Sequence, residues 1–286
     1  MPELPEVETM RRCIAAVVGS RIGDLRRPKS RLQPITIEPR LAEFRRRVKG
    51  RRIVALGRVG KRVVLALDSG DRIVLEPRMS GLILLRDAPD EEHLRLVFHV
   101  SGARARRILF WDQRGLGVAR LVSPAQFAHY YGAGKVGPDA LDITPAALRQ
   151  RLRPSARAIK VALLDQRAVA GIGNLYASEI LHRAGIHPAL SCNRLRPAHW
   201  RRLHAAMQEV LAEAIDHQGS TLRDGTYRIG RNEPGSYQLC HRVYQRAGQA
   251  CLRCAKGRIV RIVQAQRATF FCPSCQRKGL AREAPA

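Results

Sequence analysis

Residues 251–275 read CLRCAKGRIVRIVQAQRATFFCPSC, and this stretch constrains the fold more than any other part of the chain. It contains two Cys-x-x-Cys pairs, Cys251 with Cys254 and Cys272 with Cys275, separated by the seventeen residues 255–271. This spacing is typical of a site in which four thiolates bind one zinc ion. Each pair supplies two sulfur ligands from one tight turn, and two such turns can surround the ion tetrahedrally. The four cysteines are therefore the predicted zinc ligands.

The segments between the two pairs are rich in β-forming residues. Arg258–Gln264 and Arg267–Phe271 flank a short polar turn, which predicts a two-stranded ribbon clamped by the metal. A site with four protein ligands leaves no coordination position for a substrate, so we expect one structural Zn²⁺ that takes no part in chemistry. A redox-active dithiol is the alternative, but such a motif needs only one pair.

Upstream of the ribbon, the first part of the chain has a β pattern. Between Ser20 and Val122, short β-branched runs alternate with turns of Gly, Asp and Ser. The pattern predicts a β-sandwich or barrel, with Asp68–Asp71 as a hairpin turn and a helix over Glu6–Val18 that Gly19 ends. Six strands are expected, at Ile53–Leu56, Val63–Leu67, Ile73–Leu75, Leu82–Leu85, Leu94–Val100 and Ile108–Trp111.

From Thr144 onward the apolar period becomes helical. Gly185 and Gly219 are expected to end the last two helices, Gly132–Lys135 is the natural hinge between the two halves, and the tail after Gln276 is expected to be disordered. Four helices are predicted: one after Thr144, one after Ser155, Asn174–Ala184 and Pro197–His217.

The charge of the chain indicates a polyanionic partner. The 286 residues include 51 Lys and Arg against 24 Asp and Glu, which gives a formal net charge of +27. Such an excess is the electrostatic signature of a nucleic-acid-binding protein. Only seven of the 51 are Lys, which partly reflects biased codon usage, but an exchange of Lys for Arg leaves the charge unchanged.

The sequence also predicts a cytosolic protein that does not associate with a membrane. The first thirty residues contain no apolar stretch of signal-peptide length, and no later run is long enough to cross a bilayer. In a reducing compartment, disulfides are rare. Cys13, Cys192 and Cys240 have no matching partners, and we expect them to be small buried apolar side chains.

The N-terminus, Met1-Pro2-Glu3, suggests covalent chemistry. Removal of Met1, which the small Pro2 permits, exposes a secondary amine. An α-amino group titrates near about pH 8, so a useful fraction is unprotonated at neutral pH and can attack an electrophilic carbon. Glu3 would lie beside it. The alternative is purely structural, because Pro5 and Glu6 also suit the first turn of a helix.

Residues 171–176, GIGNLY, bring two glycines to a predicted helix start. Glycine allows a backbone to approach a phosphate closely, and the exposed amides of a helix N-terminus point toward an anion. Asn174 would add a donor. The motif therefore suggests phosphate binding, although a glycine turn followed by an ordinary helix cap has the same sequence.

Four motifs in the correct order resemble the bacterial formamidopyrimidine-DNA glycosylases, and the resemblance extends from Pro2 to about Gln276. The motifs are Pro2–Glu8 (PELPEVE), Gly171–Glu179 (GIGNLYASE), Gln266–Phe270 (QRATF) and the four cysteines. The resemblance implies an α+β fold with three domains. These are an N-terminal β-sandwich catalytic domain flanked by helices (1–133), a helix-two-turn-helix DNA-binding domain with a lesion loop (134–235), and a zinc-finger ribbon with the tail (236–286).

The resemblance also implies an activity. Members of the family remove oxidised purines, such as 8-oxoguanine and formamidopyrimidines, from DNA and then nick the strand by β,δ-elimination. Pro2 would attack C1′ of the sugar and form a Schiff base, and Glu3 would act as general acid and base near the ring oxygen. Glu6 would hold the catalytic corner. Lys61 would contact the phosphate beside the lesion and assist proton transfer.

Further residues match positions that contact DNA in the family. Met79, Arg114 and Leu116 match residues that fill the gap left when the damaged nucleotide turns out of the helix. Asn174 and Arg267 match ligands of the backbone phosphate. Lys160 matches a residue implicated in lesion recognition.

The chain departs from the family pattern at three places. Leu116 replaces a phenylalanine, which removes aromatic stacking. Glu76 replaces a phosphate-contacting histidine, and we expect this carboxylate to pair with a neighbouring arginine, although Arg78 could also take over the phosphate contact. The lesion loop, Asp224–Tyr237, diverges in sequence, so the resemblance leaves base specificity least secure. Its tyrosines could stack on a base or simply pack.

The expected partner is double-stranded DNA that carries oxidised bases or abasic sites, bound by a monomer in the bacterial cytoplasm and at the nucleoid. Two alternatives stay open at this point. One is an endonuclease VIII-like glycosylase for oxidised pyrimidines, against which the PELPEVE opening and the pair Met79 and Arg114 argue. The other is a non-catalytic protein that binds damaged nucleic acid.

Overall fold

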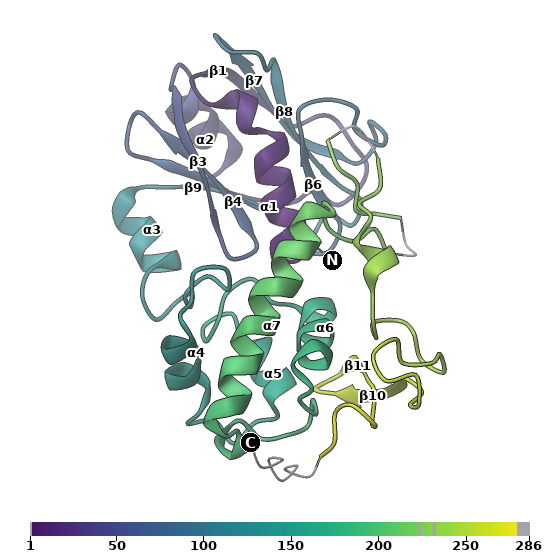
Figure 1. Cartoon of the computed structure of the whole chain (residues 1–286). Helices are drawn as coiled ribbons and strands as arrows, with labels where there is room; N and C mark the ends of the chain where they lie inside the picture. The colour runs from purple at the N-terminus through teal and green to yellow at the C-terminus, as the bar shows by residue number, and fades with distance from the viewer. Residues whose placement is uncertain (1, 223–224, 231–232, 279–286) are drawn as a thin grey trace. The chain divides into compact units, whose positions relative to one another are not determined.

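The computed structural model describes residues 2–222, 225–230 and 233–278 (Figure 1). The chain forms two compact units, each discontinuous in sequence. The first combines Met1–Lys135 with Ala214–Gln238, and the second combines Val136–Glu213 with Leu239–Ala286. The first boundary directly follows Gly132–Lys135, the segment predicted to be the hinge.

Two sheets make up most of the first unit. The four-stranded sheet is antiparallel and has the order β1 (Arg21–Arg26), β7 (Leu94–Ser101), β8 (Arg107–Asp112) and β6 (Gly81–Leu84). In the five-stranded sheet β2 pairs with β9 in parallel and the other neighbours are antiparallel. Its order is β2 (Thr36–Glu38), β9 (Val118–Val122), β5 (Arg72–Glu76), β4 (Arg62–Leu67) and β3 (Ile53–Val59).

Apolar side chains of both sheets share one hydrophobic core, which includes Leu65, Ile73, Phe98 and Phe110. Two sheets that enclose a common core form a β-sandwich, which confirms that part of the predicted fold class. Burial of this apolar surface is the main force that holds the two sheets together.

Helices flank the sandwich (Figure 1). The helix α1 (Leu4–Cys13) packs against β3, β4 and β6 and buries Val7 and Met10 in the core. The sequence predicted one helix over Glu6–Val18, but α1 ends earlier and a 3-10 turn, η1 (Ala15–Val17), follows it. Gly19, the residue predicted to end the helix, has φ +89° and lies after this 3-10 turn. Two further helices, α2 (Leu41–Val48) and α3 (Pro124–Tyr131), pack on β1, β2 and β9.

The second unit contains the helices predicted after Thr144. The helix α4 (Pro145–Leu152) begins where Thr144 Oγ1 accepts the N–H of Ala147. α5 (Ile159–Leu163) begins later than predicted, because Ser155 instead caps a local turn by accepting the N–H of Arg157. The remaining elements are α6 (Asn174–Ala184), η2 (Cys192–Arg194), α7 (Pro197–Asp216) and η3 (Tyr237–Cys240).

The helix α6 has the predicted bounds, and Gly185 ends it in the left-handed conformation. The helix α7 ends one residue earlier than predicted, and the boundary between the two units falls within its last turn, between Glu213 and Ala214. In the described part of the chain, none of the helices combines the length and the apolar character needed to span a bilayer.

The C-terminal hairpin has the predicted ribbon form, with β10 (Val260–Gln264) antiparallel to β11 (Arg267–Phe271). Its two turn residues, Ala265 and Gln266, both have positive φ (45° and 61°). Two left-handed residues match the tight turn that suits the twist of a two-residue hairpin. The turn therefore places Arg267 at the start of β11, paired with Gln264.

Candidate functional site

The start of the chain forms a buried corner. Glu3 is the N-cap of α1, and Pro5 lies in the first turn, where its missing N–H breaks no helical hydrogen bond. Oε2 of Glu6 accepts the N–H of Glu3 at 2.8 Å, which completes a capping box between the two residues. The segment thus forms a well-capped helix start, which is the purely structural role that the sequence left open. It also places Pro2, Glu3 and Glu6, three predicted catalytic residues, in one buried corner.

The second oxygen of Glu6 reaches a distant segment. Oε1 accepts the N–H of Ser220 at 2.8 Å, directly after the left-handed Gly219. A Cβ on Gly219 would lie only 2.8 Å from this oxygen, so the contact requires glycine. One carboxylate thus joins the first turn of α1 to the segment that follows α7.

A narrow hollow opens beside Pro2. Its lining comes from the chain start, from the turn before β6 and from the segment after α7, and includes Met79, Gly81, Ser220 and Tyr227. All of these residues belong to the first unit. The predicted nucleophile is thus buried, but it borders this small hollow.

The predicted lesion loop, Asp224–Tyr237, is described only over 225–230 and 233–237, and Asp224 lies outside the described residues. Tyr227 is buried, and its hydroxyl donates to the carbonyl of Gln218 at 2.9 Å. Burial raises the pKa of Tyr227 well above its ordinary value. Tyr237 is also buried. Both side chains pack within the protein in this structure, which is the alternative to base stacking that the sequence left open.

Lys61 lies in the tight turn between β3 and β4, after the left-handed Gly60. The neighbouring Arg58 fixes this turn, because it donates to the carbonyl of Gly60 at 2.9 Å and to Glu8 of α1 at 3.3 Å. Burial alone would raise the pKa of Glu8, but hydrogen bonds from Arg11 and Arg12 lower this pKa to about 2. The Lys61 turn is therefore linked through Arg58 to α1, the helix that begins at the corner of Pro2, Glu3 and Glu6.

Glu76, at the end of β5, pairs with two arginines. Its oxygens lie 2.8 Å from Nε of Arg62 and 2.8 Å from Nε of Arg78. The expected pairing with a neighbouring arginine is thus confirmed. Arg78 has a positive φ of 55°, so the chain turns sharply just before Met79.

The three predicted gap-filling residues project from two turns of the sandwich. Met79 lies between β5 and β6, and Arg114 and Leu116 lie between β8 and β9. Met79 and Leu116 are each 39% exposed, and Arg114 is exposed. Neither the methionine nor the leucine is buried in the hydrophobic core.

In the second unit, two of the predicted DNA-contacting residues, Lys160 and Asn174, meet at the ribbon. Lys160 of α5 is fully buried, and its Nζ lies 2.5 Å from Oδ1 of Asn174 and 3.3 Å from the carbonyl of Ala268. Nδ2 of Asn174 donates to the same carbonyl at 3.0 Å. Ala268 follows Arg267, whose side chain is exposed. The GIGNLY turn, α5 and β11 thus share one polar cluster, with Gly173 as the N-cap and Asn174 as the first helical residue of α6.

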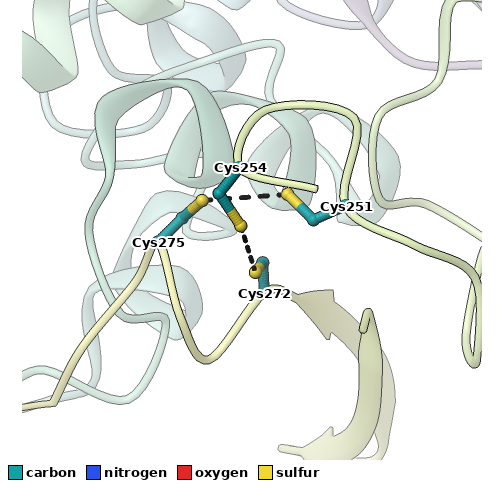
Figure 2. A group of neighbouring side chains, drawn as sticks. All are labelled: Cys251, Cys254, Cys272 and Cys275. Atoms are coloured by element: carbon teal, nitrogen blue, oxygen red, sulfur yellow. Dashed lines mark hydrogen bonds between the residues drawn. The ribbon is translucent and has the colours of Figure 1, made fainter. Parts of the chain in front are cut away.

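The four predicted zinc ligands gather at one point (Figure 2). Their sulfurs all lie within 4.8 Å of one another, with 3.7 Å between Cys251 and Cys275 and 3.8 Å between Cys254 and Cys272. Zinc–sulfur bonds of about 2.3 Å in a tetrahedron place the sulfurs about 3.8 Å apart. The donor set therefore fits a closed zinc site.

The backbone near Gly257 favours the thiolate of Cys254 and a close approach to Cys272. A hydrogen bond from the N–H of Gly257 lowers the pKa of Cys254 to about 6. A Cβ on Gly257 would lie 2.6 Å from Sγ of Cys272, so only glycine fits there. Nε2 of His182 lies 3.4 Å from Sγ of Cys251, which attaches the cysteine cluster to α6.

The three remaining cysteines correct one expectation. Cys192 is buried as predicted, but Cys13 and Cys240 are only half-buried. Cys13 is the last residue of α1 and Cys240 the last of η3. Both elements end at the surface, and the apolar character of a cysteine alone did not reveal this.

Comparison with known proteins bears directly on these features. Family models match three parts of the chain: the formamidopyrimidine-DNA glycosylase N-terminal domain at 1–119, the H2TH domain of the same glycosylase at 136–226, and a zinc finger found in FPG and IleRS at 248–277. A formamidopyrimidine-DNA glycosylase from Chloroflexus aggregans is 42% identical over 280 residues, which cover 96% of this chain and 98% of that protein. The chain belongs to the formamidopyrimidine-DNA glycosylase family.

Solved structures of glycosylases in this family have the same fold. The MutM (Fpg) protein of Thermus thermophilus is 35% identical with a TM-score of 0.82, over 97% of this chain and all of that one. The Lactococcus lactis Fpg in complex with DNA containing an abasic site is 32% identical with a TM-score of 0.82, over 96% of this chain and all of that one. The zinc-finger match and the four-cysteine cluster together establish one structural zinc in this member of the family.

Two buried carboxylates received no role from the sequence. Glu179 is fully buried on α6 and accepts the N–H groups of Arg242, Val243 and Tyr244 at 2.7–2.9 Å. Burial raises the pKa of Glu179, whereas these N–H donors act in the opposite direction. The second is Asp112, at the end of β8. An acidic residue inside an otherwise apolar run was the signal available for both.

Proposed function

We propose that this protein is a base-excision-repair DNA glycosylase and abasic-site lyase that removes oxidised purines, with Pro2 as its nucleophile. The observation that carries the proposal is the position of Pro2 beside a hollow, in one corner with Glu3 and Glu6, in a chain of this family. Met1 lies outside the described residues, and its removal is part of the proposal.

The chemistry follows from a secondary amine. The Pro2 nitrogen bonds to C1′ of the deoxyribose as the bond from C1′ to the base breaks, and the base departs with a proton. The ring then opens: the C1′–O4′ bond breaks as O4′ takes up a proton, which leaves an iminium between the Pro2 nitrogen and C1′. This iminium draws electrons from C2′, so a base can remove a C2′ proton and the 3′ phosphate leaves. A second elimination then releases the 5′ phosphate. Glu3 is the proposed proton carrier, since it is adjacent to Pro2 and capable of general acid and base catalysis.

Glu6 and Lys61 have supporting roles in this proposal. Glu6 holds the corner through its bonds to Glu3 and Ser220. Lys61 binds the phosphate beside the lesion, because its turn is tied to α1 and its ammonium is a point charge suited to phosphate.

Binding to duplex DNA supplies the geometry. Met79, Arg114 and Leu116 enter the gap left by the extruded nucleotide, where Arg114 has donors for the unpaired base. Asn174 and the exposed Arg267 form the phosphate-binding pair, and Lys160, whose Nζ lies against Asn174, contributes to lesion recognition. The net charge of +27 supports attraction to the DNA backbone.

The organisation of the whole enzyme is also part of the proposal. We propose the three functional domains 1–133, 134–235 and 236–286, with Zn²⁺ on Cys251, Cys254, Cys272 and Cys275 in the last. We further propose that the protein acts as a monomer in the bacterial cytoplasm, on DNA of the nucleoid.

A cleavage assay with matched substrates tests this function. Mature protein is incubated with duplexes that carry 8-oxoguanine opposite cytosine, an oxidised pyrimidine, or no lesion. We expect strand scission by β,δ-elimination, fastest on the 8-oxoguanine duplex. Preference for the pyrimidine lesion would instead indicate the endonuclease VIII-like activity, and tight binding to damaged DNA without scission would indicate a non-catalytic protein.

A further inference from the structure

A single buried carboxylate lies beneath the two turns that carry Met79, Arg114 and Leu116. Asp112 is the last residue of β8, and its side chain is fully buried. Its Oδ1 accepts the hydroxyl of Ser80 at 2.6 Å and the N–H of Arg114 at 3.2 Å. Its Oδ2 accepts the N–H of Gly117 at 2.7 Å. These donors come from two turns that are more than thirty residues apart in sequence.

Exposed and buried residues are direct neighbours in both turns. Met79 is 39% exposed and its neighbour Ser80 is 3% exposed. Leu116 is also 39% exposed, and its neighbour Gly117 is buried. Each exposed apolar side chain is therefore adjacent in sequence to a residue that donates to Asp112.

The two turns are also hydrogen-bonded directly to each other, and the backbone at Gly117 is closely surrounded by other atoms. Oγ of Ser80 accepts the N–H of Arg114 at 3.0 Å in addition to donating to Asp112. A Cβ on Gly117 would lie 2.6 Å from the ring of Phe110 and 3.1 Å from Oδ2 of Asp112. Glycine at this position thus lets the backbone N–H reach the carboxylate.

A buried carboxylate needs hydrogen bonds to offset its lost hydration. Here these bonds go to the two turns, while the carbonyl of Asp112, and not its carboxylate, accepts Nε of Arg95 at 2.8 Å. The carboxylate therefore fixes the turns relative to each other.

We propose that Asp112 is the positioning residue that holds Met79, Arg114 and Leu116 in a single arrangement for insertion into DNA. The inference rests on the proposed function, which assigns the insertion to these three side chains. It places the contribution of Asp112 at the extrusion of the damaged nucleotide and not at the bond chemistry on Pro2.

The test compares a substrate that requires extrusion of a base with one that has no base. Asp112→Asn keeps the shape of the side chain but turns an NH₂ group toward one of the N–H or O–H donors. Single-turnover rates are measured on a duplex with 8-oxoguanine opposite cytosine and on one with a preformed abasic site at the same position. We expect a loss of about tenfold or more on the first and less than about threefold on the second.

A spectroscopic readout follows the extrusion step itself. A 2-aminopurine next to the lesion fluoresces more strongly when its stacking is broken, so mixing with the protein should produce a rise. The rise should be slower in Asp112→Asn to the same extent as excision of 8-oxoguanine. Substitution of a residue that only stabilised the fold would lower the rates on the two substrates to the same extent.

Three further variants control the comparison. Ser80→Ala removes both hydrogen bonds of the Ser80 hydroxyl, to Asp112 and from the N–H of Arg114, but keeps the bonds from Arg114 and Gly117 to Asp112. We expect a smaller loss that is again confined to the 8-oxoguanine duplex. Asp24→Asn removes a carboxylate of the same unit that pairs with arginines at the surface, and Ile73→Val removes one buried methyl from the core. Both should leave the ratio of the two rates unchanged, and thermal unfolding is followed for every variant.

Equal losses on both substrates, or no loss on either, would overturn the inference. If Asp112→Asn does not fold, Ser80→Ala decides: a selective loss supports the positioning role, and no selective loss refutes it. Failure of the proposed function would appear differently, because the unmodified protein would then fail to cleave the 8-oxoguanine duplex.

Discussion

At the scale of single residues, the site depends on carboxylates that serve structure and chemistry together. Glu6 accepts the N–H of Glu3 and the N–H of Ser220, which lies 214 positions away in sequence. The first bond belongs to a capping box between two residues three positions apart, within the helix start that Pro5 and Glu6 suggested. The second could not be predicted, because nothing local to Ser220 marks it as a partner of the N-terminus.

Glu6→Gln tests the double role of Glu6. The amide of glutamine keeps one acceptor and turns a donor toward the other N–H, so one buried donor loses its partner. We expect unfolding in urea to show a loss of about 1–3 kcal/mol, with slower strand scission. An unchanged unfolding midpoint would show that the two bonds contribute no net stability.

Leu116→Phe tests the departure at the exposed gap-filling position. Leu116 is 39% exposed, so a ring there should not overpack the core. Aromatic stacking on a base is worth about 1–3 kcal/mol, which predicts binding to an abasic-site duplex that is tighter by about fivefold or more. The control is Leu239→Phe, at an exposed leucine of the second unit, and its affinity should stay the same. Equal changes in both variants would rule out a specific contact by residue 116.

At the scale of elements, the sequence predicted the helices and strands that are specified by residues within or directly beside them. The bounds of α6 follow from the glycines at its two ends, and six strands were found from their β-branched runs. The helix α2 was missed because Arg40 at its N-cap makes no side-chain cap. The strand β2 has only three residues. The helix α3 could have been found, since Ser123 and Gln126 form a capping box before its apolar residues.

Gly219→Ala tests the junction between the end of α7 and α1. Gly219 has φ +79°, and a Cβ there would meet the Glu6 carboxylate at 2.8 Å. Gly50, with φ +80° and no atom within 4 Å of an added Cβ, is the matched control for backbone strain alone. Both alanine variants should lose about 1–3 kcal/mol to the strained conformation, as measured by urea unfolding. Gly219→Ala should lose more and should also cleave damaged DNA more slowly, so identical behaviour of the two would argue against the role of this contact.

At the scale of the whole molecule, the sequence predicted the kind of partner and the zinc site, but it did not predict how distant elements pack together. The excess of arginine indicated a nucleic-acid partner, and the cysteine spacing indicated the zinc site without any structural information. The convergence of Lys160, Asn174 and the carbonyl of Ala268 depends on how α5, α6 and β11 pack together. The position of Asp112 beneath two turns likewise results from strand register.

Removal of zinc tests the contribution of the ribbon to DNA binding. Without the metal, the four sulfurs lose the bonds that hold the two knuckles together, and small zinc sites commonly unfold. Treatment with a chelator should therefore reduce affinity for an abasic-site duplex by at least about tenfold, and added zinc should restore it. Binding that survives complete loss of zinc would contradict the structural role of the ion.

The most direct test of the central claim is the identity of the residue that bonds to DNA. Mature protein is mixed with the 8-oxoguanine duplex, the imine is reduced with borohydride, and the adduct is digested and analysed by mass spectrometry. The account predicts a sugar remnant on the N-terminal peptide, on the nitrogen of Pro2 with Met1 removed, and weakened or abolished trapping with Pro2→Gly under conditions where DNA binding is nearly unchanged. An adduct on a lysine side chain, or full activity in protein that retains Met1, would contradict it.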